Sequence, residues 1–274
     1  MSTTAIELRD VATGYRSHGK DICTGIHMTG QMHSGKLTIL LGTNGAGKST
    51  LLRSLSGFQP ILSGEILLEG RSLNDFSRNE LARTVGVVLT EREHYGDNLT
   101  VAETVALGRT PYTGFWDKPS AHDKAIVSEA LQKMGIEAFA QRRLYTLSDG
   151  ERQKVMIAKA LAQQTSIILL DEPTAFLDFP SKLEMFCTLT QLAHEEGKAI
   201  VLSTHSITLA LQMADVLWVL KAGKTATIGT PQELSECGAL DYLFEKNGAH
   251  FDRKNMTYRL DKFEKVSTTV KESR

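Results

Sequence analysis

The chain has 274 residues, of which 41% are hydrophobic and 23% charged, a composition typical of a globular protein with one large domain or a domain and a subdomain. The 31 Lys and Arg residues nearly balance the 32 Asp and Glu residues, so the net charge of -1 gives no overall case for nucleic acid as a partner. Its three cysteines are dispersed without CxxC spacing, which argues against a disulfide framework or a zinc site. The charged start lacks the apolar run of a signal peptide, and no segment approaches the roughly 20 apolar residues of a membrane span.

Short apolar runs predict strands in the first third of the chain, at 6–8, 37–41, 65–68 and 85–89. Residues 99–135 favour helix, because Thr100 with Glu103 and Ser120 with Asp123 have the spacing of capping boxes. A longer helix is predicted to end near residue 163, and strands at 166–170, 199–203 and 216–220 then alternate with helices at 181–195 and 206–213. This alternation predicts an α/β core with a largely parallel sheet and an inserted helical block. From about residue 246 the chain is polar, and we expect an appended, partly mobile tail.

A glycine-rich segment follows the predicted strand 37–41 and precedes a helix. Glycines let backbone N–H groups approach phosphates without Cβ clashes, and the helix N-terminus adds partial positive charge. The Lys48 ammonium is expected to reach the β- and γ-phosphates, and the Ser49 hydroxyl to bind Mg²⁺. The segment matches the phosphate-loop pattern GxxxxGK[ST] and predicts an ATP site formed by Gly42, Asn44, Gly45, Ala46, Gly47, Lys48, Ser49 and Thr50.

Two carboxylates, Asp171 and Glu172, end the predicted strand 166–170. They would lie at the carboxyl edge of the sheet, where open α/β sheets bind ligands. We expect Asp171 to hold Mg²⁺ directly or through water, and Glu172 to act as general base toward the attacking water. Such a pair is often only an exposed strand end, but downstream of a phosphate loop it predicts hydrolysis of ATP.

The run 147–151, Leu-Ser-Asp-Gly-Glu, stands at the start of a predicted helix. With the phosphate loop and the Asp-Glu pair, it resembles the signature sequence of the ATP-binding subunits of ABC transporters. The resemblance implies the P-loop ABC ATPase fold, an α/β core with an antiparallel β subdomain and an inserted helical subdomain. It also implies a homodimer in which Ser148, Asp149 and Gly150 face the ATP of the partner protomer.

Three further residues extend the resemblance. His205 follows the predicted strand 199–203 and is similar to the family's switch histidine, which contacts the γ-phosphate and positions the water. Asp178 ends a segment that resembles the D-loop, which couples the two protomers. Tyr15 resembles the aromatic residue that stacks on adenine, although a tyrosine here could equally be a half-buried strand residue.

The chain departs from the family pattern at several positions. Asp149 and Glu151 replace the usual Gly and Gln of the signature, and we expect both carboxylates to face solvent or the partner chain, because negative charge near a γ-phosphate is unfavourable. Ser206 stands where Asp is frequent and can cap the next helix equally well. Thr90 replaces a Gln that binds Mg²⁺ in the family, so its shorter side chain predicts altered Mg²⁺ coordination, through water or with help from Glu91.

The run 108–112, Gly-Arg-Thr-Pro-Tyr, resembles the cassettes of type II importers, which take up iron–siderophore complexes, haem or cobalamin. Runs 205–215 and 229–234 are similar to the same group. The resemblance implies a nucleotide-binding core at 1–90 and 156–240, a helical subdomain with the signature at 91–155, and a C-terminal extension at 241–274. It implies ATP and Mg²⁺ as cofactors, integral membrane permease subunits and an extracytoplasmic binding protein as partners, no nucleic acid, and a peripheral location on the cytoplasmic face of the inner membrane.

Two other functions stay open at this point. A soluble ABC ATPase without transport, such as an accessory protein of iron–sulfur assembly, would carry the same motifs and would lack an integral membrane partner. A small-molecule kinase would use the phosphate loop, but it has no use for the run at 147–151. The residues do not identify the transported ligand.

Overall fold

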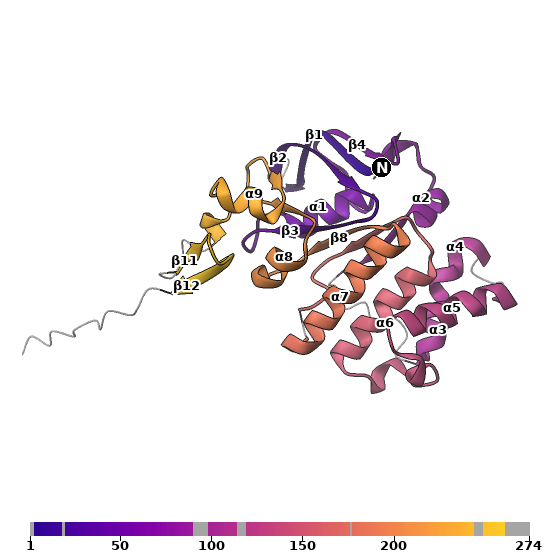
Figure 1. Ribbon diagram of the computed structural model, residues 1–274. Helices are drawn as coiled ribbons and strands as arrows, with labels where there is room; N and C mark the ends of the chain where they lie inside the picture. The colour runs from indigo at the N-terminus through magenta and orange to yellow at the C-terminus, as the bar shows by residue number, and fades with distance from the viewer. Residues whose placement is uncertain are drawn as a thin grey trace, which may run out of the picture.

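A six-stranded sheet lies at the centre of the computed structural model, which describes residues 3–17, 20–89, 98–113, 119–175, 177–243 and 249–260 (Figure 1). The strand order is β10-β9-β3-β8-β7-β6, and every neighbouring pair is parallel except the edge pair of β10 and β9. All residues of β7 and β8 are buried, as expected for parallel strands covered on both faces. The strands are β3 (Lys36–Leu41), β6 (Val85–Val88), β7 (Ile167–Leu170), β8 (Ala199–Ser203), β9 (Val216–Val219) and β10 (Thr227–Gly229).

A second, antiparallel sheet has the order β2-β1-β4-β5 and covers the first sheet from above in Figure 1. The predicted strand 6–8 covers only a short part near the start of β1, because pairing with β2 extends the backbone ladder well beyond these apolar residues. The register shifts between Leu8 and Val11, where Asp10 takes a positive φ of 50°. The strands are β1 (Thr4–Ser17), β2 (Lys20–His33), β4 (Ser63–Leu68) and β5 (Arg71–Ser72).

Helices cover the two faces of the central sheet differently. Helix α1 lies between the two sheets, whereas α3, α5, α6 and α7 lie on the opposite face of the central sheet (Figure 1). The capping boxes expected at Thr100 and Ser120 are confirmed as the N-termini of α3 and α5. The α-helices are α1 (Lys48–Leu55), α2 (Arg78–Thr84), α3 (Val101–Ala106), α4 (Thr110–Thr113), α5 (Ala121–Lys133), α6 (Asp149–Ala162), α7 (Phe179–Glu196), α8 (Ile207–Met213) and α9 (Pro231–Glu236).

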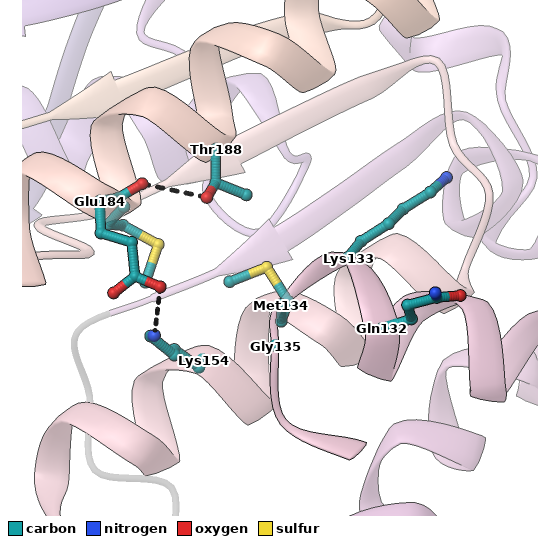
Figure 2. A pocket seen from close by; sticks show the side chains of 8 residues that line it. Gln132, Lys133, Met134, Gly135, Lys154, Glu184 and Thr188 are labelled. Atoms are coloured by element: carbon teal, nitrogen blue, oxygen red, sulfur yellow. Dashed lines mark hydrogen bonds and ion pairs between the residues drawn. The ribbon is translucent and has the colours of Figure 1, made fainter. Parts of the chain in front are cut away.

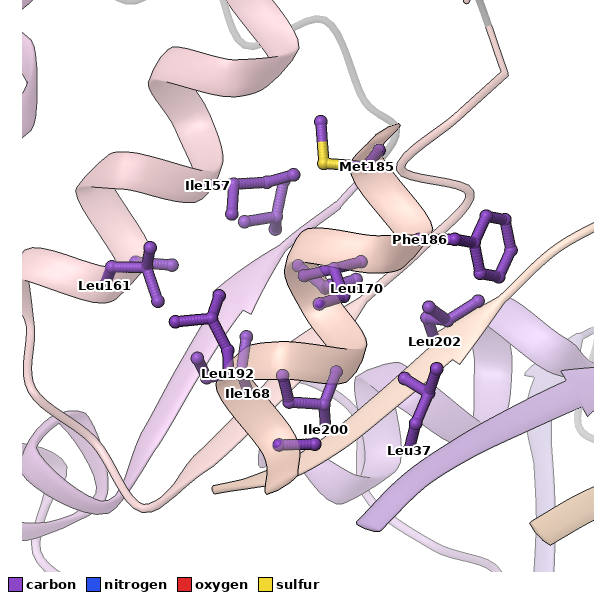
Figure 3. Close-up of a cluster of buried hydrophobic side chains, with 14 of the residues drawn as sticks. Leu37, Ile157, Leu161, Ile168, Leu170, Met185, Phe186, Leu192, Ile200 and Leu202 are labelled. Carbon is purple, nitrogen blue, oxygen red and sulfur yellow. The ribbon is translucent and has the colours of Figure 1, made fainter. Parts of the chain in front are cut away.

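Two hydrophobic clusters stabilise these layers. In the larger one, Phe186 and Leu192 of α7 pack over Leu170 and Leu202 of the sheet, while Ile157 of α6 approaches from the side (Figure 3). The smaller cluster fills the space between the two sheets around α1. Burying this apolar surface fixes the sheet whose carboxyl edge holds the predicted site.

Part of the expected tail is an ordered hairpin, while residues 244–248 and 261–274 lie outside the described residues. Residues Ala249–Asp252 (β11) and Thr257–Leu260 (β12) form an antiparallel hairpin, beside α8 and α9 in Figure 1. Phe251 of this hairpin is 8% exposed and belongs to the larger hydrophobic cluster. The polar composition of this segment gave no sign of the buried Phe251 side chain. It also gave no sign of the turn from Asp252 to Asn255, in which the Asp252 carboxylate accepts hydrogen bonds from Asn255.

Within the described residues, no helix is both long and apolar enough to span a lipid bilayer.

Candidate functional site

The predicted site residues follow three adjacent parallel strands. The phosphate loop follows β3, Asp171 and Glu172 follow β7, and His205 follows β8 two residues after the strand ends. Leu40 of β3 is in register with Ser203 of β8, so the strands end at the same edge of the sheet. The structure therefore brings together segments that lie more than a hundred residues apart in the sequence.

The phosphate loop needs its glycines for two different reasons. Gly45 and Gly47 have φ of 77° and 95°, which favours glycine. Gly42 has an ordinary φ, but a Cβ there would lie 2.6 Å from the carbonyl oxygen of Leu220. Ala46 closes the turn, because its N–H donates to the Thr43 carbonyl oxygen at 3.1 Å.

Lys48, the first residue of α1, is buried behind this loop. Its Nζ donates to the carbonyl oxygen of Gly42 at 2.9 Å and to that of Thr43 at 3.4 Å. Burial lowers the pKa of Lys48, and the nearby charges of Glu172 and Asp171 oppose that shift. The ammonium is thus held on backbone carbonyls that a phosphate group can replace.

The side chains assigned to Mg²⁺ fit a hard cation. Ser49 lies in the first turn of α1, and Asp171 is 6% exposed and accepts a hydrogen bond from the Ser203 hydroxyl at 2.6 Å. Oxygen atoms from one or two side chains, completed by substrate phosphates and water, are the usual magnesium ligands. The described residues hold no group of three or more His, Cys, Asp or Glu that could hold a metal ion. Thr90 and Glu91 lie outside the described residues.

The side chains of Glu172 and His205 are in direct contact. The Nε2 atom of His205 lies 2.6 Å from Oε1 of Glu172, and both side chains are partly accessible. Glu172 has a φ of 49°, and its N–H donates to the Ser203 hydroxyl at 2.9 Å. Ser203 was missed by the sequence analysis, although a polar residue that ends an apolar strand two positions before the histidine was a usable signal.

Ser206 does not cap α8 as expected. It occupies the N-cap position, but its side chain makes no cap hydrogen bond. Its ψ of 76° is not the extended value of a capping residue, and its N–H instead donates to the Thr204 hydroxyl at 3.0 Å.

The signature segment begins α6 with a capping box. Ser148 Oγ accepts the N–H of Glu151 at 3.3 Å, and the Glu151 carboxylate accepts the N–H of Ser148 at 2.7 Å and its hydroxyl at 2.9 Å. The expectation that Glu151 faces away is therefore wrong, because the cap gives its carboxylate two donors on the chain itself. The backbone N–H of Ser148 is the main cause of the lowered pKa of Glu151. Asp149 is exposed, as expected, and a Cβ on Gly150 would lie 2.7 Å from the Leu177 side chain.

Asp178 and Tyr15 lie on exposed parts of the chain. The Asp178 carboxylate caps α7 by accepting the N–H of Ser181 at 3.0 Å. Hydrogen bonds from the Ser181 side chain and from its N–H lower the pKa of Asp178. Tyr15 lies in β1, is paired with Ile22 and is 51% exposed. A ring with half of its surface exposed can stack on a flat base, and it also fits the alternative of a half-buried strand residue, so the role of Tyr15 stays a prediction.

A cavity of about 170 Å³ lies apart from these residues, between the end of α5 and the sides of α6 and α7 (Figure 2). Met134 and Met185 line it, and Lys154 of α6 spans it to Glu184 of α7 at 2.9 Å. A second ion pair joins Lys133 of α5 to Glu196 at the end of α7 at 2.6 Å. None of the predicted site residues lines this cavity, which is therefore part of the seam between helices.

Comparison with known proteins agrees with this geometry. A model of the family described as ABC transporter matches residues 26–175. The achromobactin transport ATP-binding protein CbrD of Dickeya dadantii is 36% identical over 241 residues, which cover 88% of each chain. The ferric enterobactin transport ATP-binding protein FepC of Escherichia coli is 34% identical over 218 residues, which cover 80% of each chain. Among solved structures, a dimeric ATP-binding cassette in a post-hydrolysis state with ADP and Pi matches with a TM-score of 0.72 and 27% identity, over 82% of this chain and 98% of that one.

Proposed function

Because this chain belongs to the ABC transporter family and is an ATPase of that family, we propose that it energises the import of an iron–siderophore type of complex through a separate membrane permease. The observation that carries the proposal is the similarity to ATP-binding subunits named for siderophore transport, over most of both chains. Haem and cobalamin remain the other ligands of the importer group that the sequence resembles. An extracytoplasmic binding protein would deliver the ligand to the permease.

Two cassettes would act together. The phosphate loop of one protomer would hold ATP, and Ser148, Asp149 and Gly150 of the other would close over the γ-phosphate. Ser148 stands at the N-terminus of α6, a helix of 14 residues, where backbone N–H groups favour an anion. Asp178, at the start of α7, would transmit this closure between the protomers.

Hydrolysis would use Glu172 and His205. In the structure, Nε2 of His205 lies 2.6 Å from Oε1 of Glu172, so the two side chains contact each other. An entering γ-phosphate would draw His205 away, and the freed Glu172 carboxylate would take a proton from the water that attacks phosphorus. Lys48 would move from the Gly42 carbonyl to the β- and γ-phosphate oxygens. Mg²⁺, held by Ser49 and Asp171, would neutralise phosphate charge.

The test is a pull-down of tagged Glu172→Gln protein from its native cell membranes, with ATP and mild detergent. Removing the general base is expected to keep the closed dimer intact, so a permease with many membrane spans should co-purify. Tagged Lys48→Ala protein is the matched control, because it keeps the surface of the cassette and loses its contact with phosphate.

Recovery of cytosolic partners alone under several detergents would contradict the transport function and favour a soluble ABC ATPase. If a permease is recovered, uptake of labelled ferric siderophore, haem and cobalamin by cells that lack this chain identifies the ligand. Uptake of the imported compound should be restored by the wild-type chain and not by the Glu172→Gln variant. Uptake of the other two compounds should change with neither.

A further inference from the structure

A tyrosine near the end of the chain reaches the back of the phosphate loop. Tyr242 lies in a 3₁₀ turn, Asp241–Leu243, and its hydroxyl donates a hydrogen bond to the carbonyl oxygen of Leu220. Its ring packs against the larger hydrophobic cluster, with the Lys221 ammonium 4.9 Å from the ring centroid. Burial raises the pKa of Tyr242 to about 12, so the phenol remains a donor at every physiological pH.

The Leu220 carbonyl, which accepts the hydrogen bond from Tyr242, lies directly against Gly42, the first glycine of the phosphate loop. Leu220 is 2% exposed, and its N–H donates to the Leu41 carbonyl oxygen at 2.7 Å, which fixes it beside the end of β3. A Cβ on Gly42 would lie only 2.6 Å from the Leu220 oxygen, so the two backbones are in close contact. The Gly42 carbonyl, in turn, holds the Lys48 ammonium at 2.9 Å.

The C-terminal hairpin fixes the tyrosine. Asp241, next to Tyr242, forms an ion pair with Arg253 in the turn between β11 and β12. Phe251 is buried in the larger cluster, and Met256 packs against the same cluster. Figure 1 shows the hairpin on the opposite side of the molecule from α3, α4 and α5, and hence away from the seam of helices.

We propose that Tyr242 is a positioning residue for ATP binding, which links the C-terminal hairpin to Gly42 and Lys48 through the Leu220 carbonyl. The proposal rests on the phosphate loop being the ATP site. A buried carbonyl without a donor is costly, so loss of the phenol hydroxyl frees Leu220 to shift toward other donors. The phosphate loop then loses its fixed neighbour, the Leu220 carbonyl. The nucleotide itself must order the loop, and the free energy needed for this ordering weakens ATP binding.

The experiment compares wild-type, Tyr242→Phe and Tyr258→Phe proteins as full chains. Tyr258 is the matched control, because it lies on β12 with 49% of its surface exposed. Tyr242→Phe should raise the Kd for Mg²⁺-ADP and the KM for ATP about threefold, with kcat within twofold. Amide hydrogen exchange across residues 42–48 should become faster in this variant alone.

Equal Kd and equal exchange in the loop for all three proteins would overturn the proposal and leave Tyr242 as a packing residue. If Tyr242→Phe does not fold, Asp241→Asn provides the second test, since it keeps the phenol and weakens its anchor to Arg253. A smaller rise in Kd is expected there, and an unchanged Kd would overturn the proposal. These measurements need no permease, so they stand or fall separately from the import of siderophores.

Discussion

The Ser203 hydroxyl links the Asp171 carboxylate to the backbone of Glu172. It donates to Asp171 at 2.6 Å and accepts the N–H of Glu172 at 2.9 Å, and the residue is fully buried. One hydroxyl thus orients the proposed magnesium ligand and fixes the backbone of the proposed general base. Its position at the end of β8 explains how the strand that leads to His205 also organises the neighbouring strand.

We therefore expect Ser203→Ala to lower the free energy of unfolding by about 1–3 kcal/mol, because it leaves buried polar groups without their partner. The kcat for ATP should fall about tenfold, since Asp171 and Glu172 lose their common contact. Ser54→Ala is the control for stability: Ser54 is fully buried, and its hydroxyl has no partner among the residues that the structure describes. Urea unfolding and steady-state ATPase assays check both variants, and equal stability losses would contradict the role of Ser203.

At the level of single residues, the sequence predicted the segments that the structure brings together at one edge of the sheet, and the roles of their side chains stay predictions. The glycine pattern and the Asp-Glu strand end follow from the chemistry of phosphate and Mg²⁺, so spacing alone located them. The orientation of Glu151 could not be read in the same way, because the signature pattern says what faces a nucleotide and not which side chain caps the helix. Ser203 and Tyr242 escaped for another reason, since each acts on residues distant in sequence.

At the scale of elements, the run 108–112 has a structural reason. Arg109 is 3% exposed, and its Nε donates to Asp123 of α5 at 2.9 Å. Its Nη1 donates to the Ala162 carbonyl at 2.8 Å, at the end of α6, and its guanidinium stacks 4.1 Å from the Tyr112 ring centroid. Arg109 therefore connects α4, α5 and α6. It also supplies a donor to a carbonyl at the C-terminal end of α6 that has no partner within the helix.

This junction should be sensitive to acid. Hydrogen bonds from the Ser120 hydroxyl and from Arg109 lower the pKa of Asp123 from 3.8 to about 2. A lowered carboxyl pKa gives stability that is complete above about pH 4 and is lost as the pH falls toward 2. Asp123→Asn should melt roughly 5 °C lower at pH 7. Its Tm should vary less than the wild-type Tm between pH 4 and 2, as measured by circular dichroism, and parallel pH curves would contradict this assignment.

Element boundaries were predicted best where two signals coincided. The strand 199–203 was predicted without error because apolar residues and flanking polar residues agree there, and the capping boxes located α3 and α5. β1 was predicted too short, because most of its pairing with β2 comes from backbone hydrogen bonds that no side-chain pattern reveals. The hairpin of β11 and β12 was missed because a single buried Phe251 anchors it.

At the scale of the whole molecule, the two sheets come close together where β2 faces β9. Trp218 of β9 is fully buried, and a Cβ on Gly30 of β2 would lie 2.9 Å from its ring. The same Cβ would lie 2.5 Å from the end of the Ile228 side chain. At this position the approach of the antiparallel sheet to the central sheet needs a residue without a Cβ atom.

Gly30→Ala should lower the free energy of unfolding by about 1–3 kcal/mol through overpacking. Trp218→Phe removes the ring atoms that the new methyl group would meet, so the double variant should be more stable than the sum of the two single losses. Urea unfolding of the four proteins measures this coupling. If the losses in free energy of unfolding of the two single variants simply add up in the double variant, the contact between Gly30 and Trp218 does not couple the two sheets.

The backbone of Glu172 has a consequence for how robust this protein can be. Its φ of 49° is a left-handed conformation that costs a residue with a side chain on the order of 1 kcal/mol and glycine very little. Selection for heat resistance alone would therefore favour replacing the residue proposed to activate water. Heat stability and the proposed activation of water therefore make opposite demands on position 172.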